Sequence, residues 1–125
     1  WPLLIDPSDL AKKMIAYAGC SVLSFWRPEE MEPERLRVAL LSMIRVGGIL
    51  ALDLVCFGGG VDRELLAEPF EQVRQGLFAE LLSRELFAVP AGSHWPKFTT
   101  LARKEEKGRF SVEQFDPKRT AKFKF

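Results

Sequence analysis

The residue with the clearest chemical potential is Asp53, a carboxylate inside the apolar run at 49–55. Two glycines at 47–48 lead into this run and three glycines at 58–60 follow it. An Ile-, Leu- and Val-rich run between glycines is typical of a strand buried on both faces of a sheet. A carboxylate there is costly unless it is paired, hydrogen-bonded or placed at the carboxyl end of the strand, where open α/β sheets bind ligands. Asp53 is therefore either part of a ligand site or a structural carboxylate.

The position of Asp53 corresponds to that of the magnesium aspartate in a P-loop nucleotidase, but its surroundings argue against catalysis. The next residue, where an ATPase would carry a catalytic glutamate, is Leu54. A P-loop needs glycines whose amides hold phosphate, a lysine for the β- and γ-phosphates and a hydroxyl for magnesium. The matching turn at 6–13 has no glycine, contains a proline and carries two aspartates that would repel phosphate. We therefore predict no catalytic residue, no metal ligand and no cofactor, and at most a relict nucleotide site formed by Asp6, Ala11, Lys12, Lys13 and Asp53.

The carboxylate of Asp53 is accordingly expected to be structural and to accept hydrogen bonds from backbone amides or from Lys12 or Lys13. The glycines at 58–60 could form an amide nest for an anion, but they also make the simplest flexible turn. His94 is the single histidine, which excludes a histidine-based metal cluster and a Ser-His-Asp triad. We expect it to pack in a loop beside Trp95.

Length and composition describe an ordinary globular chain. Its 125 residues suffice for one domain with a hydrophobic core, and apolar residues make up 47% and charged residues 28%. No basic segment precedes an apolar one at the N-terminus, and no apolar run reaches the roughly 20 residues of a membrane span. Because the chain runs from Trp1 to Phe125, we expect residues 1–125 to be one domain cut at both ends from a longer polypeptide. Cys20 and Cys56 are typical of small buried side chains in an intracellular protein.

Charge is distributed unevenly along the chain. The formal net charge is +1, but residues 97–125 hold nine Lys and Arg against four Asp and Glu. Such asymmetry can mark a surface for an acidic partner such as tubulin or nucleic acid. The alternative is a solvated basic hairpin beside an acidic helical layer. No nucleic-acid motif accompanies the phenylalanines of this segment, so nucleic acid is not favoured.

Hydrophobic spacing and breaks at glycine and proline predict alternating strands and helices. Strands are expected at 2–5, 21–26, 49–55 and 121–125, and helices at 10–18, at 33–45 and, with a stop or kink at Pro69, from 61 to about 87. Weak alternation at 97–101 and 109–114, with a polar turn at 104–108, predicts a β-hairpin. Strands that alternate with helices favour right-handed crossovers and a parallel sheet. The predicted fold is α/β, a three-layer parallel sheet with helices on both faces and a hairpin near the C-terminus.

The start of the chain resembles the fifth AAA module of dynein heavy chains. Residues 1–7 read W-P-L-L-I-D-P, and Ala11, Lys13 and Ile15 follow in the rhythm of that family. Weaker similarity continues through the helix at 33–45 and Asp53 to the closing Phe-Lys-Phe, so the resemblance covers the whole chain but is specific only at 1–15. It implies an AAA-type, P-loop-NTPase-like fold whose P-loop has degenerated. It also implies that the last strand lies between the first and the central strand.

Departures from the family refine this expectation. Asp9 stands where the family has glycine, Met14 stands where it has tryptophan, and the C-terminal segment is longer and more basic. These differences favour a dynein-related protein with one such module, such as an IQ-motif and ankyrin-repeat protein, over a dynein heavy chain. The expected function is a catalytically inactive structural or docking module of a larger cytoskeletal protein. The alternative is a nucleotide-binding or hydrolysing AAA-type module whose missing elements lie outside this fragment.

The resemblance also implies a cellular setting. The partners would be neighbouring domains of the parent chain and microtubule- or axoneme-associated proteins, and no membrane would be involved. The location would be the cytoplasm, with the cytoskeleton or a cilium as its specific site.

Overall fold

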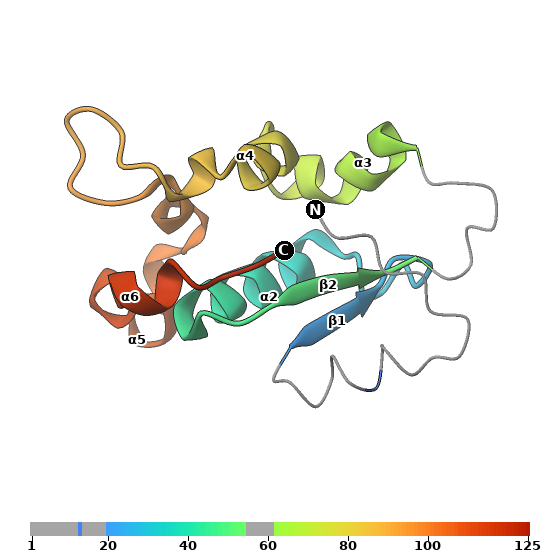
Figure 1. Ribbon diagram of the computed structural model, residues 1–125, viewed down its shortest axis with the longest axis horizontal. Coiled ribbons are helices and arrows are strands. Elements are labelled where there is room, and N and C mark those ends of the chain that lie inside the picture. Colours follow the sequence, from blue (N-terminus) through green and yellow to red (C-terminus); the bar gives the residue numbers. More distant parts are fainter. Residues whose placement is uncertain (1–12, 14–19, 55–61) are drawn as a thin grey trace.

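The computed structural model describes residues 13, 20–54 and 62–125 (Figure 1). In chain order its elements are β1 (Ser21–Ser24), α2 (Pro33–Val46), β2 (Leu50–Asp53), α3 (Arg63–Val73), α4 (Leu77–Ser83), η1 (Glu85–Phe87), η2 (Lys97–Leu101), η3 (Lys104–Glu106), α5 (Lys107–Phe110), η4 (Val112–Gln114) and α6 (Pro117–Thr120), where η marks a 3₁₀-helix. In Figure 1 helices α3 and α4 form the upper row, above α2 and the two strands, and α5 and α6 lie together at one end. The elements predicted at 2–5 and 10–18 lie outside the described residues, apart from Lys13, which is helical.

Strand β1, helix α2 and strand β2 form a βαβ unit. The strands pair in parallel, with Ser21 opposite Leu50 and Ser24 opposite Asp53. A parallel pair requires a crossover, which α2 supplies. The predicted order of strand, helix and strand is confirmed, as is the parallel pairing. Both strands are shorter than the sequence indicates.

The C-terminal segment lies along the other edge of β2. Ile49 and Lys124 form a parallel bridge, and the amide of Leu50 donates to the carbonyl of Lys124 at 2.9 Å. On the opposite edge the carbonyl of Ile49 accepts from the amide of Ser21 at 2.9 Å. The segment expected to be a strand at 121–125 therefore lies beside the central strand, although it is reduced to a single bridge. Its other expected neighbour, at 2–5, is outside the described residues.

Helix α2 supplies the largest share of the core from one element. Pro33 suits its first turn, Glu34 lies in that turn, and Gly47 ends it in the left-handed conformation at φ 69°. The side chains on one face are buried: Leu36, Leu40, Leu41 and Ile44. This face has the spacing expected of an amphipathic helix.

Helices α3 and α4 continue the core, but the break between them is not where the sequence places it. The predicted stop or kink at Pro69 is wrong as a stop, because α3 runs through Pro69 to Val73. The chain breaks instead before α4, where Gly76 adopts φ 77°. Phe70 explains why the helix continues past the proline: it is fully buried, with its ring centroid 5.2 Å from that of Phe78. Packing thus outweighs the hydrogen bond that Pro69 cannot donate.

The predicted hairpin at 97–114 is wrong. This segment forms η2, η3, α5 and η4, and no strand occurs in it. Phe98 and Leu101 are both buried at a spacing of three residues, which suits a 3₁₀ turn rather than an alternating strand. The hydroxyls of Thr99 and Thr100 donate to the carbonyls three residues before them, each at 2.8 Å, and hold the turns locally.

The described residues thus show a small parallel sheet with helices, the coarse α/β architecture that the sequence predicts. One continuous core joins the sheet, α2, α3, α4 and the C-terminal segment. No helix in the described part is long and apolar enough to cross a membrane.

Candidate functional site

The carboxyl end of the two strands is the first candidate site, because the sequence places Asp53 there. Ser24 and Asp53 end their strands opposite each other, and both are buried. The amide of Phe25 donates to the carbonyl of Asp53 at 3.0 Å, so the pairing continues past the strand ends. Asp53 therefore has the predicted burial and the predicted position at the end of its strand.

A second carboxylate reaches this end of the sheet. Oε2 of Glu30 accepts from the amide of Ser24 at 2.7 Å, and its Oε1 is 3.4 Å from Nη1 of Arg27. Glu30 belongs to the loop after β1 and is mostly buried, whereas Arg27 is half-exposed. The sequence does not single out Glu30, which lies between the predicted strand at 21–26 and the predicted helix at 33–45. The described side chains at this edge thus include a hydroxyl, two acids and Arg27, which is paired with one of the acids.

The remaining residues of the relict nucleotide site are not brought to this edge by any described contact. Asp6, Ala11 and Lys12 lie outside the described residues, and the side chain of Lys13 is exposed. The glycines at 58–60 and Cys56 also lie outside them, while Cys20 is a half-buried free thiol. Among the described residues, no group of three or more histidine, cysteine and acidic side chains could hold a metal ion. In the described part of this edge, the cation that contacts one of these residues is Arg27, which is paired with Glu30.

The strongest electrostatic cluster lies elsewhere, around Arg37, and we call it the Arg37 cluster (Arg37, Glu34, Arg103 and Glu106). All three guanidinium nitrogens of Arg37 donate hydrogen bonds. Nε and Nη2 donate to Glu34 at 3.0 and 2.6 Å. Nη1 and Nη2 donate to Glu106 at 2.8 and 2.6 Å, and Nη1 also donates to the carbonyl of Leu101 at 2.7 Å. Arg37 is 5% exposed, so this buried charge is both paired and fully hydrogen-bonded. Arg103 closes the cluster through an ion pair with Glu34 at 2.7 Å.

The electrostatics of the Arg37 cluster follow from these bonds. The hydrogen bonds from Arg37 lower the pKa of Glu106 to about 2 and also lower the pKa of Glu34. The same carboxylates raise the pKa of Arg37 further above its ordinary value. A fully protonated arginine that holds two ionised carboxylates has no proton to exchange near neutral pH. The Arg37 cluster is therefore suited to fastening the segment after Leu101 to α2, not to acid–base catalysis.

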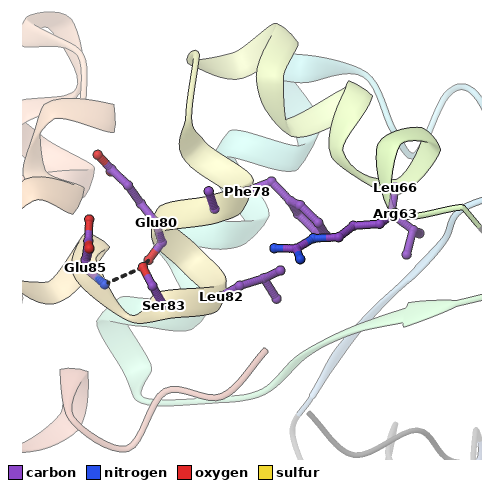
Figure 2. Close-up of a pocket in the computed structure, with 8 residues that line it drawn as sticks. Arg63, Leu66, Phe78, Glu80, Leu82, Ser83 and Glu85 are labelled. Atoms are coloured by element: carbon purple, nitrogen blue, oxygen red, sulfur yellow. Dashed lines mark hydrogen bonds between the residues drawn. The ribbon is translucent and has the colours of Figure 1, made fainter.

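An open apolar groove runs between α3 and α4 (Figure 2). Leu66, Phe78 and Leu82 form its apolar surface, and Arg63 extends over it in Figure 2, while Glu80 and Glu85 point away at the far end. Glu80 is held by ion pairs with Arg74 at 2.5 Å and Lys97 at 3.3 Å. Glu80 is thus engaged by two cations that do not line the groove.

A second hollow is more enclosed and lies beneath the loop at 88–96. Its volume is about 440 Å³, within the range of ligand pockets. We call it the Trp95 hollow, and its apolar lining includes Phe87, Val89, Trp95, Phe98, Val112 and Phe115. His94, expected to pack in a loop beside Trp95, lines this hollow. Its walls come from η1, η2, η4 and α6 as well as the loop, which is why sequence spacing gave no sign of it.

Comparison with known proteins adds no identity to this geometry. No protein-family model matches the chain, and no solved structure matches it.

Proposed function

We propose that this chain is a catalytically inactive, AAA-like structural or docking module of a larger dynein-related cytoskeletal protein. Its sheet would be the three-layer parallel sheet of that fold, with helices on both faces, and the module would not hydrolyse ATP. Its partners would be neighbouring domains of the parent chain and microtubule- or axoneme-associated proteins.

The observation that carries this proposal is the chemistry at the carboxyl end of the sheet. Parallel α/β sheets bind ligands at that end. Among the described residues, the carboxylate of Glu30 reaches the strand end beside the buried Asp53, and Glu30 already accepts a hydrogen bond from the amide of Ser24 at 2.7 Å. Arg27, a cation in the same loop as Glu30, is paired with that carboxylate at 3.4 Å, and the residue after Asp53 is Leu54 instead of a glutamate. Such an edge supports a scaffold better than a phosphate site.

One observation favours the alternative, a nucleotide-binding or hydrolysing AAA-type module. Asp53 is buried at the last position of β2, where a magnesium carboxylate belongs. The phosphate-binding elements would then have to come from sequence outside this fragment. A glycine-rich GxxxxGK[ST] segment in the parent sequence, close to Trp1, would support that alternative.

Calorimetric titration of the chain with Mg-ATP and Mg-ADP separates the two proposals. An inactive module gives no saturable heat with either nucleotide. Micromolar binding that is lost in Asp53→Ala would overturn the proposal. Asp62→Ala is the matched control, because Asp62 is an exposed aspartate that only caps α3, accepting from the amide of Glu64 at 3.1 Å.

A further inference from the structure

The rim of the Trp95 hollow exposes two large apolar side chains. Trp95 is 49% exposed and Val89 is 54% exposed, and both line the hollow. Figure 1 shows their loop extending beyond the helices at the end of the molecule where α5 and α6 lie. Exposed apolar side chains that gather on one rim mark interaction sites more often than scattered ones do. Tryptophan in particular is enriched among the residues that dominate binding energy.

The loop presents Trp95 in a defined position. The amide of Lys97 donates to the carbonyl of Ala88 at 3.0 Å and closes the base of the loop. Ser93 then fixes Trp95 from both sides, because its Oγ accepts from the Trp95 amide and donates to the Trp95 carbonyl, each at 3.1 Å. These bonds hold the backbone of Trp95, and a loop backbone that is ordered before binding costs less entropy to order on binding.

An arginine lines the hollow, and further cations are next to its lining residues in the chain. Arg84 lines it, with its guanidinium carbon 5.0 Å from the ring centroid of Phe87. Helix α6, which contributes Pro117 and Thr120 to the lining, carries Lys118 and Arg119, and Lys122 follows it. All three of these cationic side chains are exposed.

The acids in the same region are partly engaged. Asp116 caps α6 by accepting from the amide of Lys118 at 2.8 Å and also lies 4.0 Å from Nε of Arg119, and Glu85 lies 3.8 Å from Lys97. Glu113, on η4, is an exposed acid that adds one opposing charge. The surroundings of the hollow are therefore net positive, which favours an anionic partner.

We propose that the Trp95 hollow binds an acidic linear peptide that inserts one bulky apolar side chain. The enclosed apolar lining would take the inserted side chain, and the cations of α6 would face the acidic residues on either side of it. The apolar lining favours a protein segment over nucleic acid, which would bring phosphates and stacked bases to an open surface. This inference rests on the docking role proposed above and assigns it to one site.

Fluorescence anisotropy with labelled peptides tests the proposal directly on the 125-residue chain. The probe is a short peptide with a central phenylalanine between glutamates. Two matched probes carry a central alanine between glutamates and a central phenylalanine between lysines. We expect the first probe to bind at least about tenfold more tightly than either of the others, because each lacks one of the two features that the hollow recognises.

Variants of the chain then locate the binding. Trp95→Ala, and Lys118→Glu combined with Lys122→Glu, should each weaken binding of the first probe about tenfold. Trp26→Ala and Arg35→Glu are matched controls, because Trp26 is a comparably exposed tryptophan, at 41%, and Arg35 is an exposed cation near the start of α2. Both should bind like the unmodified chain. Val89→Ala, also at an exposed position, tests the rim a second time and should weaken binding.

Three results would overturn the proposal. One is the absence of probe binding up to about 1 mM peptide. Another is an equal loss of affinity in Trp26→Ala and Trp95→Ala. The third is a uridine oligonucleotide that binds more tightly than the first probe and depends on the same residues. None of these results would alter the nucleotide titration, so failure here is distinguishable from failure of the inactive-module proposal.

Discussion

Arg37 and Glu106 are joined by two hydrogen bonds, of 2.8 and 2.6 Å, across 69 residues of sequence. The bidentate pair fastens η3 to α2, and the third contact of Arg37, to the carbonyl of Leu101, fastens the end of η2. A buried side chain of the helix that packs on the sheet thus helps to fasten the segment that lacks strands.

Removal of this side chain should destabilise the protein strongly. Arg37→Leu leaves the carboxylates of Glu34 and Glu106 without their main partner and the carbonyl of Leu101 without its donor. We expect a loss of about 2–4 kcal/mol in the free energy of unfolding, measured by urea denaturation. Arg35→Leu, at an exposed position on the same helix, is the control and should change stability by less than about 0.5 kcal/mol. Similar losses in both variants would show that the Arg37 cluster is not what holds this segment.

Stability should also fall in acid because of Glu106. Hydrogen bonding from Arg37 lowers its pKa in the folded protein from 4.5 to about 2. A depressed folded-state pKa adds stability that is complete above the unfolded-state value and is lost as pH falls toward the folded-state value. Urea midpoints should therefore drop between about pH 5 and pH 2 in the unmodified chain. Glu106→Gln should start lower at pH 7 and show a shallower drop, and an identical pH profile would contradict this assignment.

Gly47 permits the close approach of α2 and α6. It has φ 69°, and a Cβ built on it would lie 2.3 Å from the carbonyl oxygen of Arg119. Gly47→Ala should therefore lower the free energy of unfolding for two reasons. An alanine in the left-handed conformation costs about 1 kcal/mol, and its Cβ would force the backbones of α2 and α6 apart. Gly92→Ala is the control, because Gly92 has φ 80° but open space around its Cβ position. Thermal melts should show Gly47→Ala to be the less stable of the two; equal melting temperatures would mean that α6 moves away at little cost.

The sequence predicts the βαβ unit well because its signals are local. The helix from Pro33 has a proline start, a glycine stop and an apolar face, and the run around Asp53 is bounded by glycines. The burial of Asp53 at the end of its strand follows from the same signals. These features depend on residues that are close together in the chain.

The features that the sequence predicts wrongly or does not predict depend on residues that are far apart in the chain. The 3₁₀ turns at 97–114 form because Phe98 and Leu101 bury in a core built by distant elements, and weak local alternation is a poor guide there. Arg37 looks like a solvated helix residue, since its partner Glu106 comes from far along the chain; the spacing of Glu34 and Arg37 was the available hint. The Trp95 hollow is assembled from separate segments, so no single stretch of sequence contains its pattern.

Asp53 decides between a scaffold and a nucleotide site, and its removal should affect stability alone. This residue is 8% exposed at the end of β2. Asp53→Ala should lower the free energy of unfolding by about 1–3 kcal/mol, since the groups around this buried carboxylate lose their partner. Asp53→Asn preserves the shape and part of the hydrogen bonding, so it should cost less.

The most direct test of the central claim is the shift of the urea midpoint on addition of Mg-ATP, measured for the unmodified chain and for Asp53→Ala. A ligand that binds only the folded state stabilises it by about 2.7 kcal/mol at a concentration one hundred times its Kd. For an inactive module, an excess of Mg-ATP leaves the urea midpoints of both proteins unchanged. Asp53→Ala is then less stable than the unmodified chain by the same amount with and without the nucleotide. A midpoint that rises with Mg-ATP in the unmodified chain but not in Asp53→Ala would contradict the account, because Asp53 would then be a metal–nucleotide residue of a working site.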